Sequence, residues 1–163
     1  MTLLEWLAAE LQEVGQRATA LLISIGMHFP TLLVFPAAFL PPYVRVFPQY
    51  NDQKRRELRG LCERLARQGA DGIVFVGEAW ISIGPTDPPS LQRRQRQEVL
   101  VVAGACATGQ RGQMYRILRD GNGTVRDVYE EPGSALHAWQ SSLLSDLPWR
   151  KTPCPPEACR RGH

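Results

Sequence analysis

One stretch of the chain, residues 71–83, constrains the fold more than any other. Within it, residues 73–76 are four consecutive apolar residues, mostly β-branched or aromatic, directly after a glycine. Such a run is typical of a strand that is buried on both faces. Beyond Gly77 the pattern alternates, so Glu78 and Trp80 share one face of the strand. We therefore expect a strand that begins in the core and ends at a rim, where it carries a carboxylate and an indole outward together.

A long helix is predicted for residues 3–25. Thr2 and Glu5 have the spacing of a capping box, and Gly26 is suited to end the helix. Apolar residues recur at intervals of three and four, the spacing of a heptad seam: Leu4, Leu7, Leu11, Val14, Ala18, Leu21 and Ile25. The seam lacks flanking charge pairs, which favours packing on the protein's own sheet over pairing with a second copy. A homodimer through this helix stays an open alternative.

Residues 18–40 form an apolar run that is long enough to be considered as a membrane span. Pro30 would break a helix in the middle of this run, so a turn followed by a strand at 31–35 explains it better. We therefore expect no membrane segment. The first residues also carry glutamates where a secretory signal needs basic residues, which favours a cytoplasmic protein.

The remaining patterns predict an α+β fold. A second helix is expected to begin at Asn51 or Asp52 and to end at Gly69. Further strands are expected at 43–47, 97–104, 111–119 and 124–130. We expect an antiparallel sheet of four to five strands with both helices packed on one face. A single domain is predicted for residues 1–147, followed by a flexible tail at 148–163.

The net charge of +3 is too small to indicate a nucleic-acid-binding protein. Of the 19 basic residues only Lys54 and Lys151 are lysine, and arginine does favour phosphate and carboxylate recognition. An arginine-driven nucleic-acid accessory protein is therefore kept as a third interpretation. Cys154, Cys159 and His163 have zinc-like spacing but lack a second pair of ligands, so we expect no metal and no cofactor.

Three short motifs lie along the second half of the chain: Glu-Ala-Trp at 78–80, Pro-Ser at 89–90 and Arg-Gln-Glu-Val at 96–99. Together they resemble a pattern found in a broad set of small bacterial and phage proteins, and the resemblance covers about residues 70–130. The resemblance implies a bacterial or phage origin. It implies no activity.

Glu78 and Glu98 are the strongest candidates for chemistry. If their strands are antiparallel neighbours, both carboxylates reach one rim, and Asp87 lies in the loop between them. Carboxylates beside an arginine would suit a small hydrolase or a metal-dependent enzyme. The opposing interpretation is a cross-strand ion pair between Glu78 and either Arg96 or Arg116 on an open sheet face.

We favour the ion pair because neither a nucleophile–base pair nor metal-ligand spacing accompanies the carboxylates. The expected function is that of a small non-enzymatic binding or structural protein that acts through protein contacts. Its binding surface is expected to include Trp80, Arg96 and Arg116.

Overall fold

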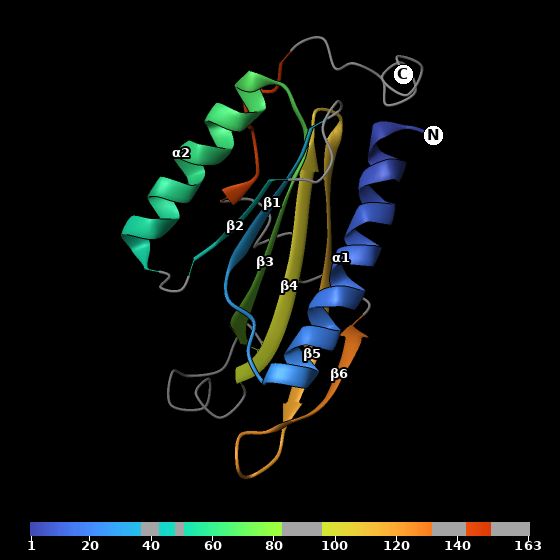
Figure 1. The fold of residues 1–163 in the computed structure, drawn as a ribbon, viewed down its shortest axis with the longest axis vertical. Coiled ribbons are helices and arrows are strands. Elements are labelled where there is room, and N and C mark those ends of the chain that lie inside the picture. Colours follow the sequence, from blue (N-terminus) through green and yellow to red (C-terminus); the bar gives the residue numbers. More distant parts are fainter. Residues whose placement is uncertain (37–42, 48–50, 83–95, 132–142, 151–163) are drawn as a thin grey trace.

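The computed structural model describes residues 1–36, 43–47, 51–82, 96–131 and 143–150 of the chain. Its elements follow in the order α1 (Leu3–Ile25), β1 (Thr31–Pro36), β2 (Tyr43–Val46), α2 (Asp52–Gln68), β3 (Ala70–Ser82), β4 (Arg96–Cys106), β5 (Gly109–Arg119) and β6 (Val125–Glu131). The strands form one antiparallel sheet in the order β2-β1-β3-β4-β5-β6 (Figure 1). The predicted α+β class is confirmed. The sheet has six strands rather than four to five, because β2 pairs with β1 along its whole length despite the prolines near it.

Helix α1 begins and ends where its caps predict. The Thr2 amide donates to Glu5 Oε2 (2.7 Å), the Glu5 amide donates to Thr2 Oγ1 (3.2 Å), and Gly26 ends the helix with a φ of 88°. Its buried face consists of Leu7, Leu11, Gly15, Ala18 and Leu22. The prediction of a buried seam is therefore wrong for the last part of the helix, since Leu21 and Ile25 are exposed. A straight helix has 3.6 residues per turn, so a heptad-spaced line of residues drifts off the buried face by about 20° per heptad.

The two helices cover opposite faces of the sheet, and the prediction that both pack on one face is wrong (Figure 1). Val74 and Val76 of β3 join the core beneath α1, whereas Ile73 and Phe75 join the core beneath α2. Successive side chains of a strand point to opposite faces. A strand that is buried on both faces requires cover on both, and one helix supplies each layer.

The position of α2 follows from the strand order. Strands β2 and β3 are both antiparallel to β1, so they run in the same direction with β1 between them. A connection between two parallel strands must cross a face of the sheet. Helix α2 makes this crossing. At its start the Lys54 amide donates to the Asn51 side chain (2.9 Å), and Gly69 ends the helix.

Residues 143–150 complete the layer that contains α2. Leu143, Leu144 and Leu147 are buried against this side of the sheet. Arg59 of α2 fixes the segment, because its Nη1 donates to the carbonyl oxygens of Leu143 (3.0 Å) and Ser145 (2.6 Å). Residues 151–163 of the predicted tail lie outside the described part of the chain. Neither α1 nor α2 combines the length and the apolar character that a membrane crossing requires.

Candidate functional site at the rim of the sheet

The register of β3 and β4 brings the predicted carboxylates to one rim of the sheet. Trp80 lies opposite Glu98, and Glu78 lies opposite Leu100. Residues directly opposite each other in an antiparallel pair share a face. Leu100 belongs to the core beneath α1, so Glu78, Trp80 and Glu98 all lie on the side of the sheet that α1 covers. The convergence of Glu78 and Glu98 is thus as the sequence predicts.

Arg119, at the end of β5, occupies the space between the two carboxylates. Its Nε donates to both carboxylate oxygens of Glu98 (3.0 and 2.7 Å), and its Nη2 reaches Glu98 Oε1 (2.6 Å) and Glu78 Oε1 (3.1 Å). Its Nη1 donates to the carbonyl oxygens of Gly26 (2.9 Å) and Gly123 (3.0 Å). One guanidinium therefore joins the end of α1, strands β3 and β4, and the β5–β6 turn. We call Glu78, Glu98 and Arg119 the rim cluster.

The cluster contains a different arginine from those that the sequence suggested. Arg116 forms a two-bond ion pair with Glu131 (2.8 and 2.7 Å), and its Cζ lies 5.9 Å from the centre of the Tyr129 ring. The predicted pairing of Glu78 with Arg116 is wrong. Arg116 and Arg119 are three residues apart, so their side chains leave opposite faces of β5, and only Arg119 lies on the same face of the sheet as Glu78. The sequence did contain a signal for Arg119. It follows the buried Tyr115 and Ile117 at intervals of two residues along β5, so it shares their face of the strand.

Two further candidates fall at the limits of the described residues. Arg96 begins β4 opposite Ser82, but its side chain lies outside the described part. Asp87 lies within residues 83–95, which are also outside it. Among the residues that the structure describes, no group of three or more His, Cys, Asp or Glu side chains lies close enough to hold a metal ion.

In the rim cluster two carboxylates share one guanidinium. Burial raises the pKa of Glu78, and the negative charge of Glu98 raises it further, while the His28 amide and Arg119 act to lower it. The two glutamate side chains are only 27% and 14% exposed. Because Arg119 occupies oxygens of both, neither carboxylate is an unpartnered base directed at open solvent. Burial lowers the pKa of the nearby His28, whose Nδ1 lies 2.8 Å from the Phe29 carbonyl oxygen.

Exposed apolar residues lie on the segments that border the cluster. The segment between α1 and β1 passes along the end of β3, where the His28 amide bonds Glu78 and Pro30 lies beside Gly77. Four residues of this segment, of the end of α1 and of β3 are 47% to 65% exposed: Ile25, Met27, Phe29 and Trp80. We call these four residues the rim patch. The structure thus places Trp80 at an exposed apolar surface.

Comparisons of the sequence with protein-family models and with curated proteins, and of the structure with solved structures, found no match.

Proposed function

We propose that this protein is a non-enzymatic binding module that contacts a protein partner through the rim patch, with Trp80 as the anchor. The observation that carries the proposal is the exposure of Trp80, which is 65% exposed on a strand whose residues 71–77 are buried. Exposed apolar patches on soluble domains mark interaction sites, and tryptophan is enriched among the residues that dominate binding energy.

The rim cluster supports this proposal over a hydrolase. A catalytic carboxylate has to reach a substrate atom in the charge state that the reaction needs. Glu78 and Glu98 instead bond the same guanidinium, which itself bonds two backbone carbonyl oxygens. Arg119 of the cluster bonds the Gly26 carbonyl oxygen, directly before Met27, and Glu98 of the cluster lies opposite Trp80 in the sheet. In this proposal the two carboxylates are structural: through Arg119 they stabilise the backbone next to the rim patch.

A cytoplasmic location is part of the same proposal. Cys62 and Cys106 are buried and unpaired. Burial raises the pKa of the Cys62 thiol to about 12, which keeps it protonated and unreactive. Free buried thiols suit a reducing compartment.

The test replaces Trp80 by a photo-crosslinking phenylalanine analogue and, in a matched control, replaces Leu118, which is 41% exposed and belongs to β5. We expect a discrete crosslinked protein from position 80 and none from position 118. The Trp80→Ala variant should then abolish co-purification of that protein and leave the unfolding midpoint nearly unchanged, because an exposed side chain buries little on folding.

Two outcomes would contradict the proposal. One is co-purification that survives Trp80→Ala. The other is a hydrolytic activity of the protein that Glu78→Gln abolishes while folding stays intact. A crosslink between two copies of this chain would identify the partner as a second copy, which agrees with a homodimer near the exposed end of α1.

A further inference from the structure

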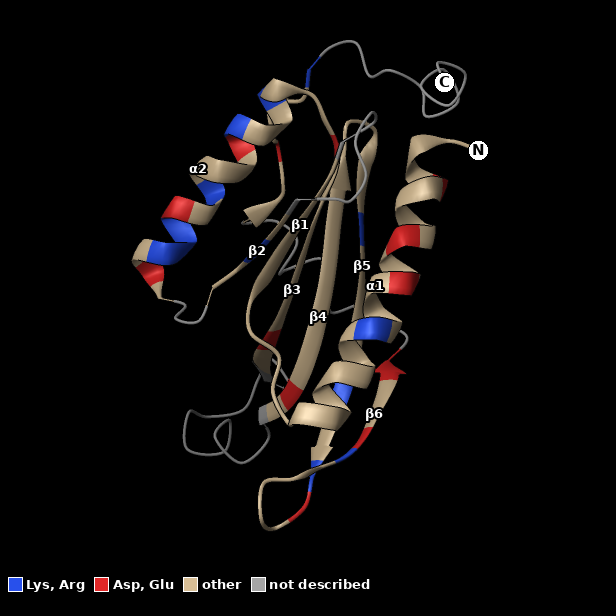
Figure 2. Ribbon diagram, in the orientation of Figure 1, with Lys and Arg blue, Asp and Glu red and all other residues tan. Residues whose placement is uncertain are grey.

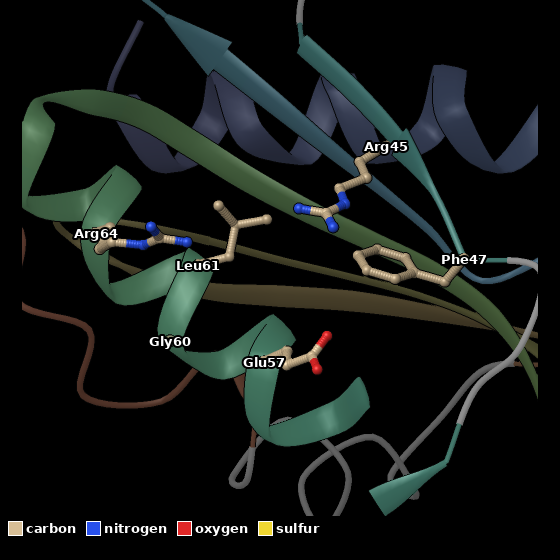
Figure 3. Close-up of a pocket in the computed structure, with 6 residues that line it drawn as sticks. All are labelled: Arg45, Phe47, Glu57, Gly60, Leu61 and Arg64. Carbon is tan, nitrogen blue, oxygen red and sulfur yellow. The ribbon is translucent and has the colours of Figure 1, made fainter. Parts of the chain in front are cut away.

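A groove lies between helix α2 and the edge strand β2, on the face of the sheet opposite the rim patch. It encloses about 480 Å³ and is lined by Arg45, Phe47, Glu57, Gly60, Leu61 and Arg64. Figure 3 shows the guanidinium groups of Arg45 and Arg64 directed toward one another from β2 and α2, with Leu61 between them and Phe47 beside Arg45. The volume is in the range of sites that bind small molecules or peptide side chains.

The two arginines of the groove are available to an anion. The Arg45 guanidinium lies 5.3 Å from the centre of the Phe47 ring, which orients it over the groove. Neither Arg45 nor Arg64 forms an ion pair with any residue in the described part of the chain, whereas the groove's Glu57 bonds Lys54 (3.1 Å). A carboxylate that entered the groove would therefore meet two guanidinium groups whose charge is not neutralised by neighbours.

Gly60 keeps the groove open. It lies in the interior of α2, where glycine is less favourable than alanine. A Cβ atom added at Gly60 would meet nothing within 4 Å, so packing does not require a glycine at this position. The absence of a side chain instead leaves the wall of the groove clear.

The outer edge of β2 continues this site along the sheet. The Phe47 amide donates to the Pro30 carbonyl oxygen (2.8 Å), so Phe47 turns its backbone groups toward β1. Alternate residues of an antiparallel strand turn these groups to opposite sides. Val44 and Val46 therefore direct their amide and carbonyl groups to the free edge, where β2 is the last strand of the described sheet.

The same two valines present an apolar surface on the other face. Val44 lies opposite Leu33, which packs against the core beneath α1, yet α1 itself lies over β3 to β6. Val44 and Val46 consequently remain 51% and 48% exposed. A strand added to β2 would meet valines on one face and arginines on the other.

The opposite edge of the sheet is built differently. Strand β6 carries Arg126, Asp127, Glu130 and Glu131 among its seven residues (Figure 2), and Glu131 is neutralised by Arg116. Charged residues along an edge oppose pairing with another chain. Strand β2 has Arg45 as its one charged residue, and that residue points into the groove.

We infer that the β2 edge and the α2 groove together bind an extended segment of a partner protein in which apolar and acidic residues alternate. The segment adds to β2 as a further strand. Its apolar side chains lie against Val44 and Val46, and its acidic side chains enter the groove and bond Arg45 and Arg64. The site shares no residue with the rim patch, so it goes beyond the function proposed above.

The test uses a fluorescein-labelled peptide of about seven residues, the length of an ordinary strand, in which valine alternates with glutamate. A first control peptide groups the same residues into one apolar and one acidic block, and a second replaces each glutamate by glutamine. We expect the alternating peptide to bind at least about tenfold more tightly than either control, as measured by fluorescence anisotropy. N-methylation of the peptide backbone on its pairing edge should abolish binding.

Three variants of the full chain locate the site. Arg45→Gln combined with Arg64→Gln should weaken binding about tenfold or more, because both charged partners of the glutamates are lost. The matched control is Arg56→Gln combined with Arg67→Gln, which removes the same charge from exposed positions of α2 that do not line the groove. Gly60→Gln adds a side chain to the wall of the groove, at a position where a Cβ meets nothing within 4 Å, and should abolish binding while the protein stays folded.

Equal affinity for the alternating and block peptides would overturn the inference. So would equal losses in the two double variants, which would indicate unspecific attraction to a basic surface, or unchanged binding by Gly60→Gln. Sedimentation that showed a dimer abolished by Val44→Lys would assign the β2 edge to a second copy of the chain and would also overturn it. None of these outcomes depends on Trp80, so they leave the rim patch to its own test.

Discussion

The rim cluster and the α2 groove use arginine in opposite ways. Arg119 donates to two carboxylates and to two backbone carbonyl oxygens, and its side chain is 25% exposed. Arg45 and Arg64 are exposed and form no ion pair with a described residue. An arginine whose donors are all used by the protein's own elements stabilises the fold. An arginine with free donors beside apolar side chains is available to a ligand. The comparison separates the residues that should matter for stability from those that should matter for binding.

The largest effect is expected at Arg119. The Arg119→Met variant leaves two carboxylates close together without their shared cation and leaves the Gly26 carbonyl oxygen without its donor. We expect the free energy of unfolding to fall by about 2–4 kcal/mol, somewhat less than for a fully buried pair because the site is partly exposed. Urea denaturation at neutral pH measures this loss. The control Arg126→Met, at an exposed position of β6, should change stability by less than about 0.5 kcal/mol. Similar losses in both variants would show that Arg119 contributes no more to stability than an exposed arginine.

Asp71 is a buried carboxyl group that bonds no side chain in the described part of the chain. It is 8% exposed, and burial raises its pKa from 3.8 to about 6. Its contribution to stability is fully present only well below pH 3.8, where Asp71 is protonated in both the folded and the unfolded state. The contribution is lost as the pH rises from 4 to 6, because the unfolded state ionises first. The stability gained by Asp71→Asn should therefore grow by roughly 2 kcal/mol between pH 4 and pH 7.

Denaturant titrations at several pH values test this expectation for Asp71. The control is Asp127→Asn, at an exposed position of β6. A constant difference between Asp71→Asn and the parent protein across this range would show that Asp71 is ionised in the folded state.

A smaller effect of opposite sign is expected in the groove. Gly60→Ala should raise the free energy of unfolding by up to about 1 kcal/mol, because alanine is the better helix former and its methyl group meets no neighbour. Thermal unfolding detects such a gain as a higher midpoint. Gly26→Ala is the informative comparison, since its φ of 88° strains any side chain and should make that variant less stable. A loss of stability in Gly60→Ala would mean that the groove is narrower than described.

The smallest effect is expected at the groove arginines. Arg45→Gln and Arg64→Gln should each change the free energy of unfolding by less than about 0.5 kcal/mol, because neither arginine is bonded to another described residue. Measured under identical conditions, the difference from the loss in Arg119→Met shows how much more Arg119 contributes to the free energy of unfolding than a groove arginine. A loss above about 1 kcal/mol in either variant would make that arginine a structural residue.

Local signals in the sequence predicted much of the fold. The capping box of Thr2 and Glu5 and the glycines at 26 and 69 set the limits of both helices. The apolar run at 73–76 identified the central strand, and its burial on both faces is confirmed. These features depend on neighbours within a few residues, which is why the sequence alone reveals them.

Features that depend on strand order could not be predicted in the same way. The face covered by α2 is set by the pairing of β1 between β2 and β3, which joins distant segments. The choice of Arg119 over Arg116 depends on which face of β5 is buried. The exposure of Trp80 depends on where α1 ends, since the strand itself continues past the cover that the helix provides.

The strand order also has a consequence for the synthesis of this protein. The apolar face of α1 is buried against β3 to β6, and β4 begins about 70 residues after α1 ends. At about 5–20 residues per second, a ribosome needs roughly 4–14 s to produce that length. Helix α1 therefore leaves the ribosome with Leu7, Leu11 and Leu22 uncovered. They remain exposed until the strands that bury them have been synthesised. During this interval the nascent chain displays an amphipathic helix, the kind of surface that chaperones bind.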